Sequence, residues 1–468
     1  MGRCKLKYSD IYQYFWMRRD RPYREKLLHY RQELEQNEWL SSNQIQEAQW
    51  YHLKRLLEHA YANVPFYRRR FDEAGIQPGL IKTPEDIQRI PILTRQDVQA
   101  NLDDLIATNC DRSKLRRNYT GGSTGTPMVF YQDHEHQAYH NAAKLRLRAW
   151  AGFEMGDKLA VLWGADRDIS KRGWIARQRL HLIMRERRLN TYNLTPEKME
   201  GFAQVLIRWQ PKYILSYASS AYLFASFLQE RGLDHIRPVA IETSAEKLWD
   251  FQRPVIEDAF KCRVFNFYGS REITSVAAEC EKHAGLHVFS DIVYLELLHD
   301  GQPVAPGQVG EIIVTDLANL AMPFIRYQNG DLAQASSESC SCDRPFPLLT
   351  EIIGRSNDVL STPNGQYVHG AFFNHLFFGI DGVQRFQVHQ TSLDKVTIKI
   401  QSNGKLSVGS LQTLREKVVE HLGPGIEIKF QTVDMIPPTP TGKYRYIISE
   451  VPLAFVTQRT DLNQQVAP

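Results

Sequence analysis

"FQRPVIEDAFKCRVFNFYG", residues 251–269, passes from a helical segment directly into a short strand-like run. The same alternation extends from about residue 134 to residue 350. Further β-branched runs follow helical segments as "KLAVLW" at 158–163, "YILSY" at 213–217 and "PVAIETS" at 238–244. Strands that alternate with helices are typical of βαβ units, in which helices cover a parallel sheet. The sequence therefore predicts an α/β fold with mainly parallel sheets.

The pattern changes towards the C-terminus. After residue 290, "IVYLELL" and "GEIIVTDL" are joined by "DGQPVAPGQVG", which predicts an antiparallel hairpin. From about residue 355, the order strand, strand, helix, strand predicts a small α+β domain. We therefore expect a large N-terminal α/β domain over residues 1–353, which includes a helical segment over 1–75. A small C-terminal domain over 354–455 and a polar tail over 456–468 complete the expected organisation.

Composition argues against several classes of protein. A net charge of +4 over 468 residues is weak, so we expect no nucleic-acid partner. No apolar run approaches the roughly 18 residues of a membrane-spanning helix, so we expect no transmembrane segment. The first residues lack a signal-peptide core and six cysteines are too few for a disulfide scaffold, which together indicate a cytoplasmic protein. The sequence leaves the oligomeric state open between monomer and dimer.

One basic stretch, residues 167–190, contains eight arginines and lysines among apolar residues. It is compatible with a solvated surface helix whose apolar stripe packs on the core. The alternative is a surface for an anionic cofactor or for membrane headgroups, so peripheral membrane association stays open.

The stretch "YTGGSTGTP" at 119–127 has the composition of a phosphate-binding loop. Its glycines expose backbone N–H groups, its serine and threonines add O–H donors, and it contains no acidic residue. It lacks the lysine of G-x-x-x-x-G-K-[ST] and does not match G-x-G-x-x-G. Glycine, proline and hydroxyl residues also form ordinary turns, so the loop alone leaves both interpretations open.

Four further motifs follow this loop in chain order. They are "NFYGSRE" at 266–272, "RYQNGD" at 326–331, "GRSND" at 354–358 and "PPTPTGK" at 437–443. In this order the set resembles the adenylate-forming superfamily, and more closely its branch of phenylacetate–CoA ligases, CapK and coenzyme F390 synthetase. The resemblance extends over about residues 45–450. It implies a reaction in which a carboxylate attacks the α-phosphate of ATP, giving an acyl-adenylate and pyrophosphate.

The resemblance implies roles for residues of the first two motifs. The loop around the triphosphate of ATP would consist of Thr120, Gly121, Gly122, Ser123, Thr124, Gly125 and Thr126. Tyr268 would stack on adenine, and Glu272 would hold Mg²⁺. The nucleotide would also be flanked by Ser244, Glu246, Gly269 and Ser270. The chain departs from the superfamily at Met128, where a lysine is common, and at Arg271, where a threonine is common.

The last three motifs would complete the nucleotide-binding site and would include the hinge between two conformations of the enzyme. Asp331 would accept hydrogen bonds from both ribose hydroxyls, and Arg355 would lie near the ribose and phosphates. Lys443 would contact the α-phosphate, where negative charge builds up during adenylation. Family members alternate between this adenylating pose and one that admits CoA, about a hinge that corresponds to Asn357. The usual hinge residue is Asp, so the departure puts the second half-reaction in question.

Cysteine and histidine positions indicate a metal site. Cys280 lies in "AAECEKHAGLHV", and Cys340 and Cys342 lie in "ESCSCDRPF", so a Cys₃His set suited to tetrahedral Zn²⁺ is available. The histidine is either His283 or His287, and resemblance to zinc-bearing relatives favours His287. With four protein ligands the zinc would be structural. Buried free thiols or a disulfide are the alternatives.

Three functions stay open from the sequence. The first is ATP-dependent adenylation of a small carboxylic acid followed by transfer to CoA, and Tyr217 with Tyr268 would suit an aryl acid. The second, by resemblance to CapK and coenzyme F390 synthetase, is adenylyl or acyl transfer without CoA, for instance in capsular or exopolysaccharide biosynthesis. The third is a non-catalytic nucleotide-binding module. The presence of Glu272, Asp331 and Lys443 argues against this third function.

Overall fold

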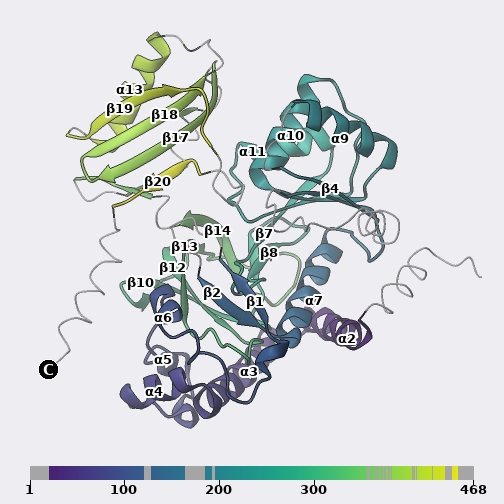
Figure 1. Ribbon diagram of the computed structural model, residues 1–468, viewed down its shortest axis with the longest axis vertical. Coiled ribbons are helices and arrows are strands. Elements are labelled where there is room, and N and C mark those ends of the chain that lie inside the picture. The colour runs from purple at the N-terminus through teal and green to yellow at the C-terminus, as the bar shows by residue number, and fades with distance from the viewer. Residues whose placement is uncertain are drawn as a thin grey trace, which may run out of the picture.

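The computed structural model describes residues 20–120, 128–163, 185–191, 196–355, 359–363, 367–369, 373, 376–377, 380, 382–402, 406, 408–423, 425–437 and 445–451. Within these residues, twelve strands form one mixed sheet in the order β11-β10-β12-β13-β14-β9-β8-β7-β6-β5-β3-β4. Figure 1 shows helices around this sheet and a separate C-terminal sheet above it. The observed fold is α/β with a separate α+β region, as the sequence predicts, but the large sheet is mixed and not mainly parallel, because only the pairs among β3 to β7 are parallel in the described part of the sheet.

The parallel half of the sheet contains the predicted alternation. Its strands are β3 (Leu159–Leu162), β4 (Glu186–Leu189), β5 (Tyr213–Tyr217), β6 (Ala240–Ser244) and β7 (Arg263–Tyr268). The helices between them are α9 (Pro196–Trp209), α10 (Ala218–Glu230) and α11 (Gln252–Phe260). These helices lie together in Figure 1, and Phe224 and Phe260 meet Ile241 and Val264 of the strands in a buried cluster. α11 ends at Lys261, whose left-handed φ of 52° turns the chain towards β7.

The other half of the sheet is antiparallel. Next to β7 lie β8 (Ala277–Glu279) and β9 (Leu286–Val288), and the sheet continues through β14 (Leu348–Arg355) and β13 (Tyr327–Ala335). The hairpin predicted between residues 292 and 317 is formed by β10 (Val293–His299) and β12 (Val309–Asp316), with the short β11 (Gln302–Pro303) at the edge. The β13–β14 register places Asp331 opposite Arg355, so two of the predicted motifs are cross-strand neighbours.

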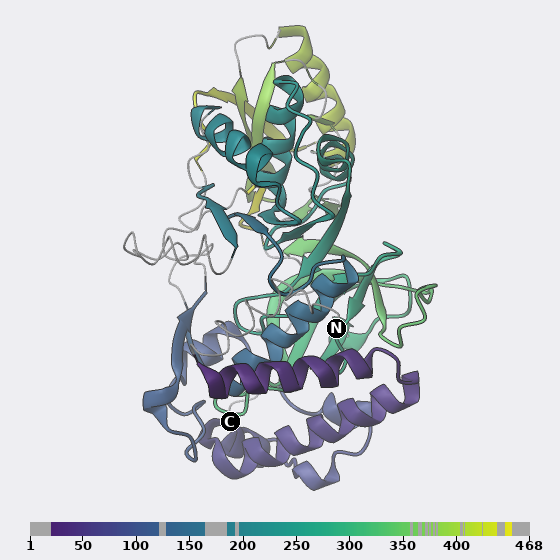
Figure 2. The same ribbon diagram turned by 90° about the vertical axis from the view of Figure 1, so that its right-hand side faces the viewer.

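Helices and a short hairpin precede the sheet. The helices are α2 (Arg21–Asn37), α3 (Ser42–Asn63), α4 (Pro65–Glu73), α5 (Pro84–Ile87) and α6 (Arg95–Ala100), with 3₁₀ turns at Pro78–Leu80 and Arg112–Lys114. α3 begins with a capping box between Ser41 and Gln44, and α4 begins with a proline, both of which are favoured at helix N-termini. The hairpin of β1 (Arg116–Tyr119) and β2 (Val129–Gln132) leads to α7 (His134–Trp150). Figure 2 shows the N-terminal helices, in purple, along one end of the molecule.

Helix α7 is held by a buried ion pair. Both terminal nitrogens of Arg146 donate to the carboxylate of Asp291, at 2.5 and 3.1 Å, and one of them also donates to the carbonyl oxygen of Leu34. The guanidinium lies over the rings of Phe289 and Phe346, with 4.9 Å to each ring centre. Because a buried charge needs such partners, these contacts fix α7 against α2 and the antiparallel half of the sheet.

The C-terminal region has its own sheet, in the order β19-β18-β17-β20. Its elements are β17 (Val383–Ser392), β18 (Lys395–Ser402), α13 (Val408–Leu422), β19 (Glu427–Val433) and β20 (Ile447–Ser449), preceded by a hairpin of β15 (Val359–Ser361) and β16 (Tyr367–His369). The predicted order strand, strand, helix, strand is confirmed. Val388, Ile398 and Val418 belong to a core that is distinct from the other clusters of described residues.

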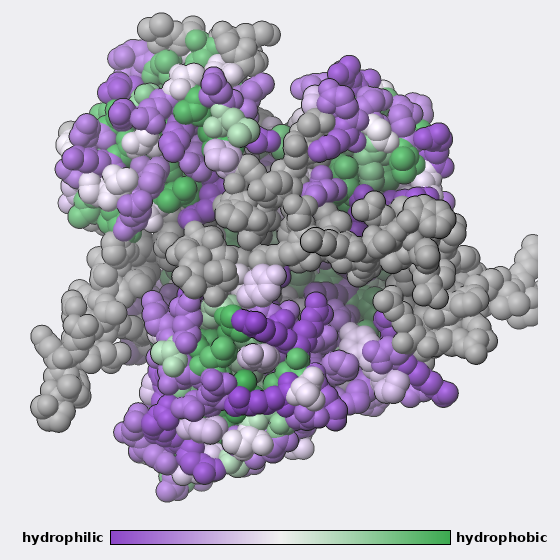
Figure 3. Space-filling model, in the orientation of Figure 1, coloured by the Kyte–Doolittle hydropathy of each residue, from purple (hydrophilic) through white to green (hydrophobic). Residues whose placement is uncertain are grey.

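None of the described helices is long and apolar enough to cross a membrane. Figure 3 shows hydrophilic residues interspersed with apolar ones over the face that it presents. The basic stretch 167–190 ends in the strand β4 (Glu186–Leu189), so the surface helix with which its sequence is compatible does not extend over the whole stretch. Its residues 167–184 lie outside the described part of the chain.

Candidate active site

The predicted nucleotide-binding residues gather at one edge of the sheet. Ser244 ends β6 and Tyr268 ends β7, and these strands are parallel neighbours, so their carboxyl ends lie side by side. Gly269, Ser270 and Glu272 follow in the loop after β7. In open α/β sheets, ligands bind outside the carboxyl ends of the parallel strands. The structure therefore places these residues where a ligand is expected.

Tyr268, Asn329 and Asp331 form a hydrogen-bonded group. The Tyr268 hydroxyl donates to Oδ2 of Asp331 at 2.7 Å, and Nδ2 of Asn329 donates to the Tyr268 hydroxyl at 2.7 Å. The backbone N–H of Asp331 donates to Oδ1 of Asn329 at 3.0 Å. Since Asp331 also lies opposite Arg355, the sheet brings three separate sequence motifs to one place.

Glu272 is buried and held through both its side chain and its backbone. The hydroxyl of Tyr327 donates to Oε1 of Glu272 at 3.2 Å. Nε2 of Gln132 donates to the carbonyl oxygen of Glu272 at 3.0 Å and to that of Arg271 at 3.3 Å. Only 8% of Glu272 is exposed. Its carboxylate is therefore held in place and offers oxygen atoms of the hard type that Mg²⁺ prefers.

The turn that carries Glu272 depends on Gly269. A Cβ at Gly269 would lie 2.1 Å from the carbonyl oxygen of Thr274, a separation that real Cβ atoms do not show. Ser270 closes the turn, because its Oγ accepts from the N–H of Ile273 at 3.1 Å and its carbonyl oxygen accepts from the N–H of Thr274 at 2.8 Å. Gly269 and Ser270 therefore shape this loop, a role that the sequence motif did not indicate.

Thr120 and Met128 close the base of the glycine-rich loop. The N–H of Thr120 donates to the carbonyl oxygen of Met128 at 2.9 Å, and the N–H of Met128 donates to Oγ1 of Thr120 at 3.1 Å. Met128 is fully buried, and its sulfur lies 3.9 Å from the hydroxyl of Tyr327. Tyr327 therefore links the base of this loop to Glu272. Outside the described residues lie Gly121, Gly122, Ser123, Thr124, Gly125 and Thr126.

Glu246 lies at the same edge and is bonded to the protein. Its Oε2 accepts from the N–H of Ser219 at 3.0 Å, in the first turn of α10, where the helix dipole stabilises a carboxylate. Burial raises the pKa of Tyr446 in the C-terminal region, and the Glu246 carboxylate adds to this rise. The structure thus gives Glu246 a helix-capping contact that the sequence did not predict.

The remaining predicted residues are described in part or lie outside the described chain. Lys443 and Asn357 are outside it, and only the backbone of Arg355 is described. The described group still combines an aromatic ring, a buried carboxylate and a hydrogen-bonded carboxylate at one sheet edge. These are chemical groups that suit a base, a hard metal ion and a sugar, respectively.

The structure also brings Cys280, His287, Cys340 and Cys342 together. Their sulfur and nitrogen ligand atoms all lie within 4.8 Å of one another. The sulfurs of Cys280 and Cys340 are 3.6 Å apart, and the sulfur of Cys342 lies 3.3 Å from Nε2 of His287. Ligands of a tetrahedral Zn²⁺ are about 3.5 Å apart, since the bonds to N and S are about 2.0–2.3 Å long. The group therefore has the spacing of a zinc site.

His287 has the tautomer that a metal ligand requires. Its Nδ1 lies 3.3 Å from the carbonyl oxygen of Phe346, which can only accept, so Nδ1 carries the hydrogen and Nε2 carries a lone pair. Burial lowers the pKa of His287 to about 4, which keeps the ring neutral. His283, the alternative ligand, instead lies 3.2 Å from Glu279 and packs against Phe265. The geometry therefore favours His287 over His283.

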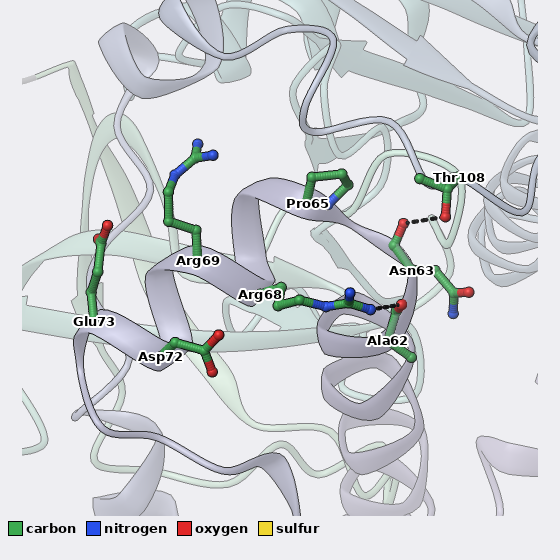
Figure 4. Close-up of a pocket in the computed structure, with 8 residues that line it drawn as sticks. All are labelled: Ala62, Asn63, Pro65, Arg68, Arg69, Asp72, Glu73 and Thr108. Atoms are coloured by element: carbon green, nitrogen blue, oxygen red, sulfur yellow. Dashed lines mark hydrogen bonds between the residues drawn. The ribbon is translucent and has the colours of Figure 1, made fainter.

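A surface hollow of about 460 Å³ lies where α3 meets α4. Figure 4 shows that Arg68 turns back to the carbonyl oxygen of Ala62 and that Thr108 donates to that of Asn63, so these groups serve the local structure. The residues that line this hollow include none of those predicted from the motifs. The candidate active site is therefore the sheet edge and not this hollow.

Comparison with known proteins agrees with this fold. A family model of the CapK C-terminal domain matches residues 360–450. Protein CapK of Staphylococcus aureus is 25% identical over 422 residues, which cover 87% of this chain and 90% of that protein. The phenylacetate-coenzyme A ligase of Escherichia coli strain K12 is 29% identical over 333 residues, which cover 69% of this chain and 74% of the ligase.

Solved structures of acyl-CoA ligases share the fold. A 2-hydroxyisobutyryl-CoA ligase in its postadenylation state aligns with a TM-score of 0.72 at 22% identity, over 92% of this chain and 94% of that one. In its thioesterification state, the same ligase aligns with a TM-score of 0.60. The chain is thus homologous to CapK and to phenylacetate-coenzyme A ligases, and it has the fold of adenylate-forming ligases. The resemblance predicted from the motif order is confirmed.

Replacement of Gly269 tests the turn that carries Glu272. In Gly269→Ala, the new Cβ collides with the backbone of Thr274, so the turn has to move. We expect the midpoint of thermal unfolding to fall by about 4 °C, which corresponds to a strained loop in a large domain. Gly79→Ala is the matched control, because a Cβ there meets nothing within 4 Å. Equal midpoints for the two variants would contradict this account of the turn.

Proposed function

We propose that this relative of CapK and the phenylacetate-coenzyme A ligases is an AMP-forming ligase. It adenylates a carboxylic acid with ATP and then transfers the acyl group to CoA. The observation that carries this proposal is the grouping of Tyr268, Glu272 and Asp331 at the carboxyl edge of the sheet, in a chain homologous to such ligases. The same edge is where ligands bind in open α/β folds.

Different residues bind the different parts of Mg·ATP. The ring of Tyr268 stacks on adenine, while its hydroxyl holds Asp331 in position to accept from the ribose hydroxyls. Thr120 and the loop 121–127 supply N–H and O–H donors to the triphosphate. Glu272 contributes the oxygen ligand for Mg²⁺, which when bound neutralises charge on the phosphates.

Adenylation brings two anions together, because a carboxylate attacks a phosphate. The protein therefore has to add positive charge and hold the two groups in line. Since the buried Met128 cannot supply that charge, we assign it to Lys443, with Arg355 near the ribose and phosphates. The C-terminal region then rotates about Asn357 to admit CoA. The better alignment with the postadenylation state than with the thioesterification state supports an adenylation-side pose for the described arrangement.

A second function has support of its own, namely adenylyl or acyl transfer to an acceptor other than CoA. CapK aligns over a larger share of this chain than the phenylacetate-coenzyme A ligases do. The family model that matches residues 360–450 is also that of CapK. These residues lie in the region that would move between the two half-reactions, so the acceptor is the point at which the two functions differ. A polysaccharide precursor is the acceptor class that the resemblance to CapK favours.

Release of pyrophosphate from Mg·ATP tests the proposal. The protein is assayed with a panel of aryl and aliphatic acids, with and without CoA. We expect turnover with at least one acid to need CoA and to yield a thioester. Turnover that ignores CoA but requires a sugar, an amine or a phenol would favour the second function. A lack of pyrophosphate release with every acid and acceptor would contradict both functions.

Lys443→Ala tests the assignment of the charge that adenylation needs. We expect the rate of pyrophosphate release to fall about a hundredfold or more, as when one preorganised donor to a developing anion is removed. ATP binding, measured by calorimetry, should persist because the other nucleotide contacts remain. Lys429→Ala is the control, since Lys429 is exposed on β19 of the same region. An unchanged rate in Lys443→Ala would remove this residue from the mechanism.

We also propose that Cys280, His287, Cys340 and Cys342 hold a structural Zn²⁺. The donor set is a Cys₃His set, and its spacing and the tautomer of His287 fit a tetrahedral site. Cys280 directly follows β8, His287 lies in β9, and Cys340 and Cys342 lie in the segment between β13 and β14. Such an ion would cross-link three parts of the antiparallel half of the sheet, without a role in the chemistry.

Metal analysis by mass spectrometry tests the zinc site. Protein purified without chelator should contain about one zinc per chain, as a site with four ligands of this type predicts. Cys340→Ser should lose most of the zinc and unfold at a lower temperature. Cys262→Ser should retain it, because Cys262 lies outside the group of four. A zinc content near zero in the unaltered protein would exclude the site.

A further inference from the structure

Three buried side chains outside the predicted site meet next to the loop of Glu272. His136 and His140 lie one turn apart on α7, and Asp316 ends β12. Nε2 of His136 lies 2.9 Å from Oδ2 of Asp316, and Nε2 of His140 lies 3.1 Å from Oδ1. All three residues have an exposed fraction of zero. By donor type alone, two histidines and a carboxylate in this arrangement could hold a metal ion.

The tautomer of His140 argues against a metal ion in this cluster. The backbone N–H of Ser275 donates to Nδ1 of His140 at 3.3 Å, so Nδ1 carries the lone pair. The hydrogen of the neutral ring is then on Nε2, and it is donated to Asp316. Burial lowers the pKa of His140 to about 4, which agrees with a neutral ring. Nε2 therefore has no lone pair to offer, in contrast to Nε2 of His287.

The bond between His140 and Ser275 holds one side of the loop that carries Glu272. Ser275 lies three residues after Glu272. The other side is held by Gln132, whose amide donates to the carbonyl oxygens of Glu272 and Arg271. Gln132 and His140 both belong to the β2–α7 segment, which directly follows the glycine-rich loop. One rigid segment therefore connects the base of that loop with the Glu272 loop.

We propose that His140, with Asp316 as the acceptor for its Nε2–H, is a positioning residue for the carboxylate of Glu272. The proposal rests on the function above, in which Glu272 binds the Mg²⁺ of Mg·ATP. Mg²⁺ tolerates little departure from its short ligand distances. Without His140, the Ser275 N–H keeps only its 3.1 Å bond to the carbonyl oxygen of Ile273, a γ-turn contact across Thr274, whose φ is 75°. Such a turn is strained on its own, so the loop relaxes away from the ligand position.

Two substitutions at His140 separate positioning from packing. The side-chain oxygen of Asn reaches the position of Nδ1, so His140→Asn keeps an acceptor for Ser275, whereas His140→Leu removes it. Pyrophosphate release is measured against Mg²⁺ concentration at saturating ATP and acid. We expect His140→Leu to raise the Mg²⁺ concentration for half-maximal rate about tenfold and to lower kcat, with the KM of the acid unchanged. His140→Asn should stay within about threefold of the unaltered protein.

A measurement that does not depend on activity accompanies the kinetics. Hydrogen–deuterium exchange of the peptide that contains Ser275 should be faster in His140→Leu than in the unaltered protein and in His140→Asn. If the unaltered protein releases no pyrophosphate, the proposed function fails, and the exchange experiment still decides whether His140 holds the loop. Unchanged exchange in His140→Leu overturns the inference.

A destabilised variant elsewhere controls for general loss of stability. Leu228→Ala opens a cavity in the buried cluster beneath α10, in a part of the core that does not include the Glu272 loop. We expect its thermal midpoint to fall while its Mg²⁺ dependence stays that of the unaltered protein. If Leu228→Ala shifts the Mg²⁺ dependence as much as His140→Leu does, the effect at His140 is one of stability and the inference is wrong.

Discussion

The buried ion pair between Arg146 and Asp291 sets the position of helix α7, and the site is built around that helix. A guanidinium taken out of water needs a set of acceptors for its N–H groups. The two terminal nitrogens of Arg146 donate to the carboxylate of Asp291 and the carbonyl oxygen of Leu34, which belong to separate elements, while Nε has no hydrogen-bond partner among the described residues. The set forms only when α2, α7 and the segment before β10 are docked together. A one-residue slip of α7 would rotate the guanidinium by about 100° and break it.

With its position fixed, α7 holds distant parts of the protein in register. Near its start, His140 contacts the loop of Glu272. Near its end, Arg148 donates to Glu242 of β6 at 2.7 Å, and the ring of Trp150 packs edge-on against that of His287. All of these contacts are made by one rigid helix, α7. The loop, the parallel strands and the Cys/His group therefore cannot shift independently of one another.

The order of helices and strands could be predicted from the sequence, whereas the contacts between residues on different strands of the sheet could not. The alternation around residues 251–269 predicts strands and helices because it depends only on neighbouring residues. Motif order also placed Tyr268 and Asp331 in one site, but their hydrogen bond follows from a strand order that puts β8, β9 and β14 between β7 and β13. Glu246 is a second residue whose hydrogen-bond partner could not be predicted from the sequence. Its motif indicates a position beside the nucleotide, while its carboxylate caps α10 by accepting from the N–H of Ser219, 27 residues earlier in the chain.

The two buried histidine clusters show why spacing alone cannot assign a metal site. Nε2 of His287 lies next to the sulfur of Cys342, and Nε2 of His140 lies next to the carboxylate of Asp316. Burial lowers the pKa of both rings and keeps them neutral. The difference is at the other ring nitrogen. A carbonyl oxygen from Phe346 forces the hydrogen onto Nδ1 of His287, and an N–H from Ser275 forces it off Nδ1 of His140. One Nε2 thus has a lone pair that it can offer to a metal ion, and the other is a hydrogen-bond donor to a carboxylate. In each case the tautomer is determined by a backbone group that is distant in the sequence. It therefore cannot be assigned before the fold is known.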